Sequence, residues 1–241
     1  MSDESYDLQV ASRIYVIGDI HGRLDLLDQL ITKIDMDMKR EPSAEAFTVT
    51  LGDYIDRGPH SRGVLERLVR NPFPTPYLAL KGNHEELFED FFENPSLGSQ
   101  WRHLGGLETL HSYGVPVSLL MLGKGFREAA NLLRERVPKA HLEFLSSLRT
   151  SASSGLFFLC HAGVRPGIPL NRQNARDLLW IRDEFLNSTI DFGKRVIHGH
   201  TPTNTPEVLP NRINIDTGAY MTGRLTCVVL EGERHRFLIA E

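Results

Sequence analysis

Residues 49–58 read V-T-L-G-D-Y-I-D-R-G, and this stretch decides the fold. An apolar run typical of a buried strand ends at Gly52, and Asp53, Asp56 and Arg57 follow directly after it. Charged side chains are rarely buried unless they are paired or bind a metal. The stretch therefore predicts a strand whose end carries a polar or metal-binding site.

Two neighbouring segments have the same form. Residues 13–19 (R-I-Y-V-I-G-D) and 77–83 (Y-L-A-L-K-G-N) are apolar runs that also end in glycine followed by Asp or Asn. Segments with helical spacing separate the runs, and a third follows; their apolar residues are Leu24, Leu27, Ile31 and Ile34, then Val64, Leu65, Leu68 and Val69, and then Leu87, Phe88, Phe91 and Phe92. This β-α-β-α-β order predicts a layered α/β fold with parallel strands.

In the later part of the chain, strand patterns and helix patterns alternate less regularly. We expect strands at 156–161 and 195–198, a helix near 174–186, and three antiparallel strands at the C-terminal end. Those three read I-N-I-D-T-G-A, L-T-C-V-V-L-E and R-F-L-I-A, and the last two are joined by a turn at Gly232.

Three further regions complete the organisation. Residues 1–12 are expected to be a flexible tail, and residues 13–241 a single domain. The glycine-rich residues 94–138 are expected to be a helical excursion near the substrate groove. In it, Trp101 and the segment L-G-G-L-E-T-L are candidate groove walls, and a helical cap on the core is an equally good interpretation.

Composition limits the class of protein. The 241 residues carry a net charge of −4 and show no basic footprint, so nucleic acid is not an expected partner. Two cysteines suit a reducing compartment. The acidic N-terminal residues do not resemble a signal peptide, and no run of about 18 apolar residues occurs. We therefore expect a cytoplasmic globular protein that does not bind membranes.

Histidines accompany the strand-end oxygen ligands. His21 follows Asp19, His84 follows Asn83, and later strands end in His161 and in the H-G-H of residues 198–200. Because ligands bind at the carboxyl ends of parallel strands, these side chains are expected to meet at one edge of the sheet. A mixture of Asp, Asn and His suits manganese, iron or zinc. Six candidate ligands favour two ions, with Asp53 between them, and two ions suit hydrolysis of phosphate esters.

Seven short elements appear in a characteristic order and spacing. They are G-D-I-H-G (18–22), G-D-Y-I-D-R-G (52–58), G-N-H-E (82–85), C-H-A-G (160–163), L-L-W-I-R (178–182), H-G-H-T-P (198–202) and I-D-T-G-A (215–219). Together they resemble the signature of the phosphoprotein phosphatase (PPP) family of metallophosphoesterases, in particular its bacterial and phage, lambda-phosphatase-like branch. The resemblance spans about residues 13–219.

The resemblance implies a fold and an activity. The fold would be the layered α/β calcineurin-like metallophosphoesterase fold, with mixed β-sheets packed together, flanking helices and a βαβαβ core. The activity would be that of a serine/threonine protein phosphatase on phosphoproteins or phosphopeptides, with phosphotyrosine as a further substrate. Two divalent ions would serve as cofactors, with Mn²⁺ as the first expectation and iron or zinc as alternatives.

The resemblance also implies roles for single residues. The implied metal ligands are Asp19 and His21 for the first ion, Asp53 as the bridge, and Asn83, His161 and His200 for the second ion. His84 would be the general acid, and Asp56 would orient it and favour its protonated form. Arg57 and Arg182 would bind the phosphoryl oxygens. A metal-bridging water would attack phosphorus directly, without a phosphoenzyme.

Two other functions remain open. One is hydrolysis of diadenosine tetraphosphate and other dinucleoside polyphosphates. By resemblance, the symmetrical enzymes of that kind lack the second Asp of G-D-x-x-D-R-G and carry Asp after G-N-H, whereas this chain has Asp56 and Glu85. The other is a non-catalytic phosphate-binding module, which the complete set of six ligands disfavours.

The remaining polar residues receive plainer expectations. His198 is expected to pack near the site, and Asp216 either to support a ligand histidine or to cap a turn. Arg165 is expected to be a solvated loop residue, and Cys160 a buried thiol that is not a nucleophile. Five histidines are expected at the surface or in packing contacts: His60, His103, His111, His141 and His235.

Overall fold

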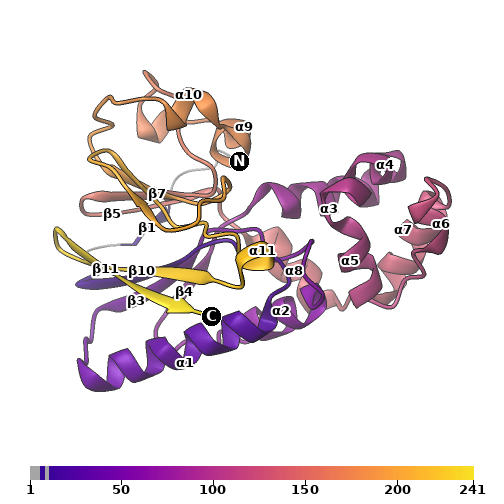
Figure 1. Cartoon of the computed structure of the whole chain (residues 1–241), viewed down its shortest axis with the longest axis horizontal. Helices are drawn as coiled ribbons and strands as arrows, with labels where there is room; N and C mark the ends of the chain where they lie inside the picture. Colours follow the sequence, from indigo (N-terminus) through magenta and orange to yellow (C-terminus); the bar gives the residue numbers. More distant parts are fainter. Residues whose placement is uncertain (1–5, 9–10) are drawn as a thin grey trace.

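The computed structural model describes residues 6–8 and 11–241, and two β-sheets form its centre. The sheets lie one above the other, with helices on their outer faces and a lobe of helices at one end (Figure 1). Apolar side chains of both sheets, such as Val16 and Val49 from one and Leu159 and Ile197 from the other, form a buried cluster between them. The expected layered α/β fold with mixed sheets is confirmed.

The five-stranded sheet contains the predicted core. Its order is β11 (Arg234–Ala240), β10 (Leu225–Glu231), β2 (Arg13–Ile17), β3 (Ala46–Thr50) and β4 (Tyr77–Ala79). Strands β2, β3 and β4 are parallel, and α1 (Leu24–Arg40) and α2 (Ser61–Leu68) connect them. All five residues of β2 are buried, as expected of a parallel strand covered on both faces.

The six-stranded sheet differs from expectation at two places. Its order is β1 (Tyr6–Asp7), β5 (Ser151–Ser154), β6 (Phe157–Cys160), β7 (Arg195–His198), β9 (Arg212–Asn214) and β8 (Glu207–Val208). The prediction of a flexible tail is wrong for Tyr6 to Leu8, because β1 pairs with β5 and Leu8 is buried; residues 1–5 and 9–10 lie outside the described residues.

The second difference concerns the C-terminal strands. β10 and β11 pair antiparallel through the predicted turn at Gly232. Strand β9 was expected in the same group, but it lies in the other sheet and is parallel to β7. The chain passes from one sheet to the other after β9, through α11 (Ala219–Thr222), so neighbours in sequence are not neighbours in a sheet.

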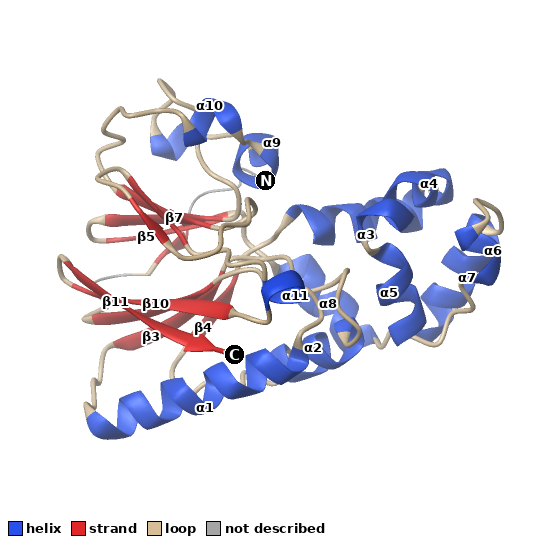
Figure 2. Cartoon of the chain, in the orientation of Figure 1, coloured by secondary structure: helices blue, strands red, loops and turns tan. Residues whose placement is uncertain are grey.

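The predicted helix at 174–186 is two short helices. These are α9 (Ala175–Trp180) and α10 (Asp183–Leu186), which cover the outer face of the six-stranded sheet (Figure 2). Ile181 between them has extended backbone angles, φ −61° and ψ 143°, so the helix cannot continue. The chain between β6 and β7 also contains the short 3₁₀ helix η3 (Leu170–Arg172), which precedes α9.

The helical lobe begins at the end of the five-stranded sheet. Helix α3 (Asn83–Glu93) starts it, as predicted. The excursion at 94–138 is helical, as expected, and consists of several short pieces: η1 (Pro95–Leu97), α4 (Gly98–Trp101), η2 (Arg102–Leu104), α5 (Gly106–Ser112), α6 (Ser118–Met121) and α7 (Phe126–Arg136), followed by α8 (Lys139–Ser147). Within the described residues, no helix is both long and apolar enough to cross a membrane.

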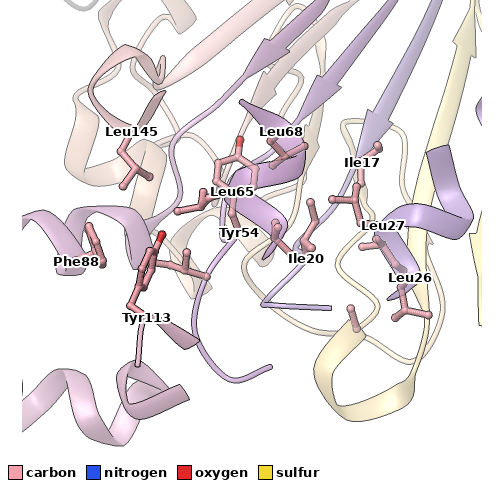
Figure 3. Packing of buried hydrophobic residues seen from close by; sticks show 14 of the residues in the cluster. Ile17, Ile20, Leu26, Leu27, Tyr54, Leu65, Leu68, Phe88, Tyr113 and Leu145 are labelled. Carbon is pink, nitrogen blue, oxygen red and sulfur yellow. The ribbon is translucent and has the colours of Figure 1, made fainter. Parts of the chain in front are cut away.

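One hydrophobic cluster joins the lobe to the sheet. It includes Leu27 of α1 and Leu65 of α2, together with Phe88 of α3, Tyr113 beyond α5 and Leu145 of α8 (Figure 3). Because the same cluster reaches from the sheet into the lobe, the lobe has a fixed position relative to the carboxyl ends of β2, β3 and β4. The loops after these strands lie at that junction.

Candidate active site

The loops after the strands have unusual backbone angles. Six non-glycine residues in the described part of the chain have positive φ, and five of them are predicted site residues: His21 (44°), Asp53 (50°), Asp56 (71°), Arg57 (65°) and His200 (67°). The left-handed region costs most residues of order 1 kcal/mol or more, although Asp and His tolerate it better than most. Such outliers collect where surrounding structure enforces a functional geometry.

Two glycines make room for the buried carboxylates. A Cβ atom on Gly82 would overlap Oδ1 of Asp53, and one on Gly199 would overlap Oδ1 of Asp19. The G-N-H and H-G-H motifs therefore need glycine for space, because each backbone passes directly against a carboxylate of another loop.

A first group of possible metal ligands consists of His21, Asp53 and His84, whose ligand atoms all lie within 4.8 Å of one another. Nδ1 of His21 lies 2.8 Å from the carbonyl oxygen of Ile55 and must donate to it, so Nε2 carries the lone pair. Burial lowers the pKa of His21 to about 3 despite the nearby Asp53, so the ring is neutral. Its Nε2 nevertheless faces Oδ2 of Asp53 at 3.4 Å, which places two acceptors opposite each other. A cation between them would remove this repulsion.

The second group consists of Asp53, His161 and His200. Nδ1 of His161 lies 3.1 Å from the Leu51 carbonyl, so its Nε2 also carries a lone pair. That Nε2 lies 2.9 Å from Oδ1 of Asn83 and 3.4 Å from Oδ1 of Asp53. Burial lowers the pKa of both histidines, that of His200 to about 2, and Nε2 of His200 is buried with no hydrogen-bond partner in the described structure.

Two further carboxylates lie beside these groups. Asp19 belongs to neither group, but it accepts a hydrogen bond of 3.1 Å from the His200 backbone N–H. Burial, together with the charges of Asp216 and Asp53, raises the pKa of Asp19 well above its usual range. Burial likewise raises the pKa of Asp216 to about 6, and its Oδ1 accepts from the Gly218 N–H, so this residue does cap a turn.

These observations agree with a site for divalent ions. The neutral imidazoles of His21, His161 and His200 present lone pairs. The carboxylates of Asp19, Asp53 and Asp216 are buried close to one another, and Asp53 belongs to both groups. A buried cluster of this composition is costly without positive charge, and bound cations reverse that cost. Oxygen and nitrogen ligands of this mixture fit divalent transition metals.

His84 of the first group forms a hydrogen-bonded pair with Asp56. Nδ1 of His84 lies 2.6 Å from Oδ2 of Asp56 and donates to it, which leaves Nε2 facing the site. Burial opposes a charged ring, but Asp53 and Asp56 outweigh burial and raise the pKa of His84. Nη2 of Arg57 lies 3.3 Å from Nε2 of His84, so the predicted acid and one predicted phosphate ligand are in contact.

The two predicted phosphate-binding arginines are held differently. The Arg57 guanidinium lies over the ring of Tyr220, 4.7 Å from its centroid, and is half-buried. Arg182 is exposed, and its Nη1 donates to Oγ1 of Thr201 over 3.2 Å. The positive charge of Arg182 helps to lower the pKa of His200, so this arginine lies near the second group.

Several residues that support the site were not predicted to do so. Of the two interpretations of Trp101, its burial agrees with a cap on the core and not with a groove wall: its side chain is 1% exposed, and its Nε1 donates to Oδ2 of Asp56 over 2.7 Å. Glu85 was used only to distinguish substrate classes, but its carboxylate accepts from the backbone N–H groups of Asp53, Tyr54 and Gly82. Glu85 is the third residue of α3 and its carboxylate accepts from the N-cap N–H of Gly82, which is the glutamate half of a capping box; a Glu three residues after the N-cap could have indicated the role.

Other polar residues stand as follows. His198 is buried against Phe185, as predicted, and burial raises the pKa of the Cys160 thiol, which fits an unreactive cysteine. Arg165 is not simply solvated, because it pairs with Asp177 and Glu184. The remaining histidines are at the surface or in packing contacts, as expected: His60, His103 and His111 are exposed, His235 is half-buried, and His141 is buried against Tyr113 and Glu66.

Comparison with known proteins places this geometry in a family. The profile of the family described as Calcineurin-like phosphoesterase matches residues 12–219. Serine/threonine-protein phosphatase 2 of Salmonella typhimurium is 28% identical over 222 residues, which cover 88% of this chain and 90% of that protein. The asymmetrical bis(5'-nucleosyl)-tetraphosphatase PrpE of Bacillus mycoides is also 28% identical, over 88% of this chain and 87% of that protein.

A solved structure has the same fold. It belongs to a protein provisionally named a diadenosine tetraphosphatase, with a TM-score of 0.68 and 20% sequence identity. The similarity covers 99% of this chain and 98% of that one. At this identity the match concerns the fold alone.

Proposed function

This chain belongs to the calcineurin-like phosphoesterase family, and we propose that it hydrolyses phosphate monoesters of phosphoproteins, with phosphoserine and phosphothreonine as the main substrates and phosphotyrosine as a further one. The observation that carries the proposal is the position of His84. Its Nδ1 is fixed on Asp56, and its Nε2 lies 3.8 Å from the carboxylate of Asp53, which both ligand groups share. A general acid beside a paired cation site suits cleavage of a phosphate ester.

The proposed ligands are the six of the sequence pattern: Asp19, His21, Asp53, Asn83, His161 and His200. Two divalent ions bound there, manganese in our proposal, would supply an activated water and neutralise charge on the phosphoryl oxygens. Burial keeps the imidazoles of His21 and His200 neutral, as metal ligands must be.

The chain's own groups bind the phosphate and move the proton. Arg57 and Arg182 are proposed to hold the phosphoryl oxygens, a task that suits a planar donor with two N–H groups on one side. The Tyr220 ring beneath Arg57 limits the directions that its guanidinium can take. His84 donates its Nε2 proton to the leaving oxygen, while its Nδ1–H continues to donate to the Asp56 carboxylate, so that the ring keeps its orientation.

Hydrolysis of dinucleoside polyphosphates is the second candidate. The resemblance to the Bacillus mycoides tetraphosphatase favours it as much as sequence identity favours a protein phosphatase. Asp56 and Glu85 argue against a symmetrical hydrolase, but that relative is asymmetrical, so these two residues do not decide between the candidates.

A substrate panel tests the proposal. The purified protein with Mn²⁺ is assayed on phosphoserine, phosphothreonine and phosphotyrosine peptides and on diadenosine tetraphosphate, and kcat/KM is compared. We expect the highest value on a phosphoserine or phosphothreonine peptide. A preference of about a hundredfold for the dinucleotide, about 2.7 kcal/mol in transition-state binding, would overturn the proposal.

A further inference from the structure

The carboxylate of Asp56 is held by the helical lobe. The residue is fully buried, and its Oδ2 accepts hydrogen bonds from Nδ1 of His84 and from Nε1 of Trp101, over 2.6 and 2.7 Å. Its Oδ1 accepts from Oγ1 of Thr109 over 2.5 Å. Both oxygens are therefore fixed, and two of the three donors come from residues outside the sequence motifs.

The backbone at Asp56 depends on the same helices. Its N–H donates to Oγ1 of Thr109 over 2.9 Å and to Oγ of Ser61 over 3.1 Å. The next N–H, that of Arg57, donates to the Gly105 carbonyl of the lobe over 3.2 Å. Because Asp56 and Arg57 both have positive φ, these bonds hold a backbone that would otherwise relax.

Trp101 is itself fixed by the helix that carries His84. Its ring packs against Phe88 and Phe91 of α3, with centroids 5.9 and 4.9 Å away, and His84 lies in the first turn of that helix. On the other side, Gly106 passes so close to the indole that a Cβ atom there would overlap it. The indole N–H thus has one available direction, toward Asp56.

We propose that Trp101 and Thr109 are positioning residues for proton donation: they lock the Asp56 carboxylate so that it holds Nδ1 of His84 and directs Nε2 at the leaving oxygen. The inference rests on the proposed function, in which His84 is the acid. In that step a water oxygen forms a new bond to phosphorus, the phosphorus–oxygen bond of the ester breaks with its electron pair staying on the leaving oxygen, and the Nε2 proton moves to that oxygen. If Asp56 lost one of its donors, the His84 ring could turn, and the distance from its Nε2 to the leaving oxygen would increase.

A role in positioning differs measurably from a role in folding. Loss of stability lowers the amount of active enzyme and reduces all activities by the same factor. Poor alignment of the acid instead matters most where the leaving oxygen needs the proton most. Phenyl phosphate has a leaving group with a pKa near ~10, like tyrosine, whereas p-nitrophenol is a much better leaving group.

The experiment compares Trp101→Phe and Thr109→Val with the unmodified full chain, each with Mn²⁺. Trp101→Phe removes one donor to the Asp56 carboxylate, and Thr109→Val removes another together with one of the two acceptors of the Asp56 N–H, while both variants keep a side chain of similar size. We expect kcat on phenyl phosphate to fall about tenfold, part of the ~10²–10⁴ due to a general acid, and kcat on p-nitrophenyl phosphate to fall less than about threefold.

Thr48→Val is the matched control. Thr48 is fully buried in β3, and its hydroxyl hydrogen-bonds to that of Thr75 over 2.6 Å. Thr48→Val likewise removes a buried threonine hydroxyl from its hydrogen bond, so it should lower both activities by one common factor. In a His84→Asn background, Trp101→Phe should no longer change the ratio of the two activities, because residues that act as a unit are not additive.

A second measurement does not depend on turnover. In the zinc-loaded protein, which is diamagnetic, the proton resonance of His84 Nδ1 reports its bond to Asp56, and His84→Asn assigns it. We expect both variants to shift or lose this resonance and Thr48→Val to leave it unchanged. An unchanged resonance together with equal losses on both aryl phosphates would overturn the inference. Failure of the proposed function would show separately, as the unmodified enzyme's preference for the dinucleotide.

Discussion

Replacing Glu85 by glutamine tests how the backbone of the site is held. Glu85 is fully buried, and its two oxygens accept three backbone N–H groups. Oε2 takes those of Asp53 and Gly82, over 2.8 and 2.9 Å, and Oε1 takes that of Tyr54 over 2.8 Å. Burial and the charge of Asp53 raise the pKa of Glu85 to about 8, whereas the three donors favour its charged form.

The magnitude follows from counting these donors. A glutamine has one amide oxygen in place of two carboxylate oxygens. In the more favourable of its two orientations, that oxygen accepts from the N–H groups of Asp53 and Gly82, and the NH₂ group faces the Tyr54 N–H. One buried donor is then unsatisfied, at about 1–3 kcal/mol, and at pH 9, above the raised pKa of Glu85, the two remaining bonds also lose the charge that strengthens them, at about 1 kcal/mol each. Relief of repulsion from Asp53 and of the cost of burying a charge offsets part of this. We expect a net loss of about 2–3 kcal/mol in the free energy of unfolding.

Urea unfolding of EDTA-treated protein at pH 9 measures this loss without a contribution from metal affinity. For a chain of this length, about 2–3 kcal/mol also corresponds to a fall in Tm of roughly 4–12 °C. Glu93→Gln is the control, because Glu93 lies on the same helix and is exposed; it should change stability by less than about 0.5 kcal/mol. If Glu85→Gln lowered the free energy of unfolding no more than Glu93→Gln does, Glu85 would not hold the loop, and the reasoning would be refuted.

Three further predictions concern the acid, the metals and pH. His84→Asn should lower kcat by about 10²–10⁴ with the metal content unchanged, measured by steady-state kinetics and elemental analysis; unchanged turnover would remove His84 from the acid role. Asp53→Asn changes the one ligand common to both groups and should reduce bound metal from two ions per chain to less than one after dialysis. A metal content equal to that of the unmodified protein would exclude Asp53 as a shared ligand. Asp37 lies elsewhere, on α1; burial opposes its ionisation, but hydrogen bonds from Arg236 and Tyr15 outweigh burial and lower its pKa. A carboxyl whose pKa is lowered by folding stabilises the protein above its unfolded pKa near 3.9 and loses that stabilisation as pH falls through the folded value. Asp37→Asn should therefore cost about 1 kcal/mol at pH 7, allowing for the partly exposed Arg236, and nothing near pH 2, in urea titrations at both pH values; a cost independent of pH would contradict this.

The part of the fold that the sequence predicted is the part that is encoded locally. Strands β2, β3 and β4 are short apolar runs that end at glycine, and α1 to α3 bury residues at helical spacing. Because ligands follow strand ends directly, predicting the strands was enough to bring Asp53, Asn83 and His161 together.

What the sequence did not predict depends on contacts between distant residues. Strand β1 is two residues long and exists through its pairing with β5, which no local pattern reveals. Strand β9 has the same alternation whichever sheet it joins, and the passage through α11 decides which sheet that is. Trp101 meets Asp56 across 45 positions, so the sequence indicated only a groove wall or part of a helical cap on the core.

The distinction between local and distant contacts bears on how the site is maintained. The residues proposed to do chemistry sit in strained loops, and their carboxylates are buried beside one another, so the loops have no stability of their own. Their geometry comes from Glu85, which holds three N–H groups, and from Trp101 and Thr109, which hold Asp56. A chain could thus retain every ligand and arginine of the motifs and still lose the alignment of His84 if Trp101 or Thr109 of the lobe were replaced. The lobe residues therefore belong to the requirements of the site as much as the motifs do.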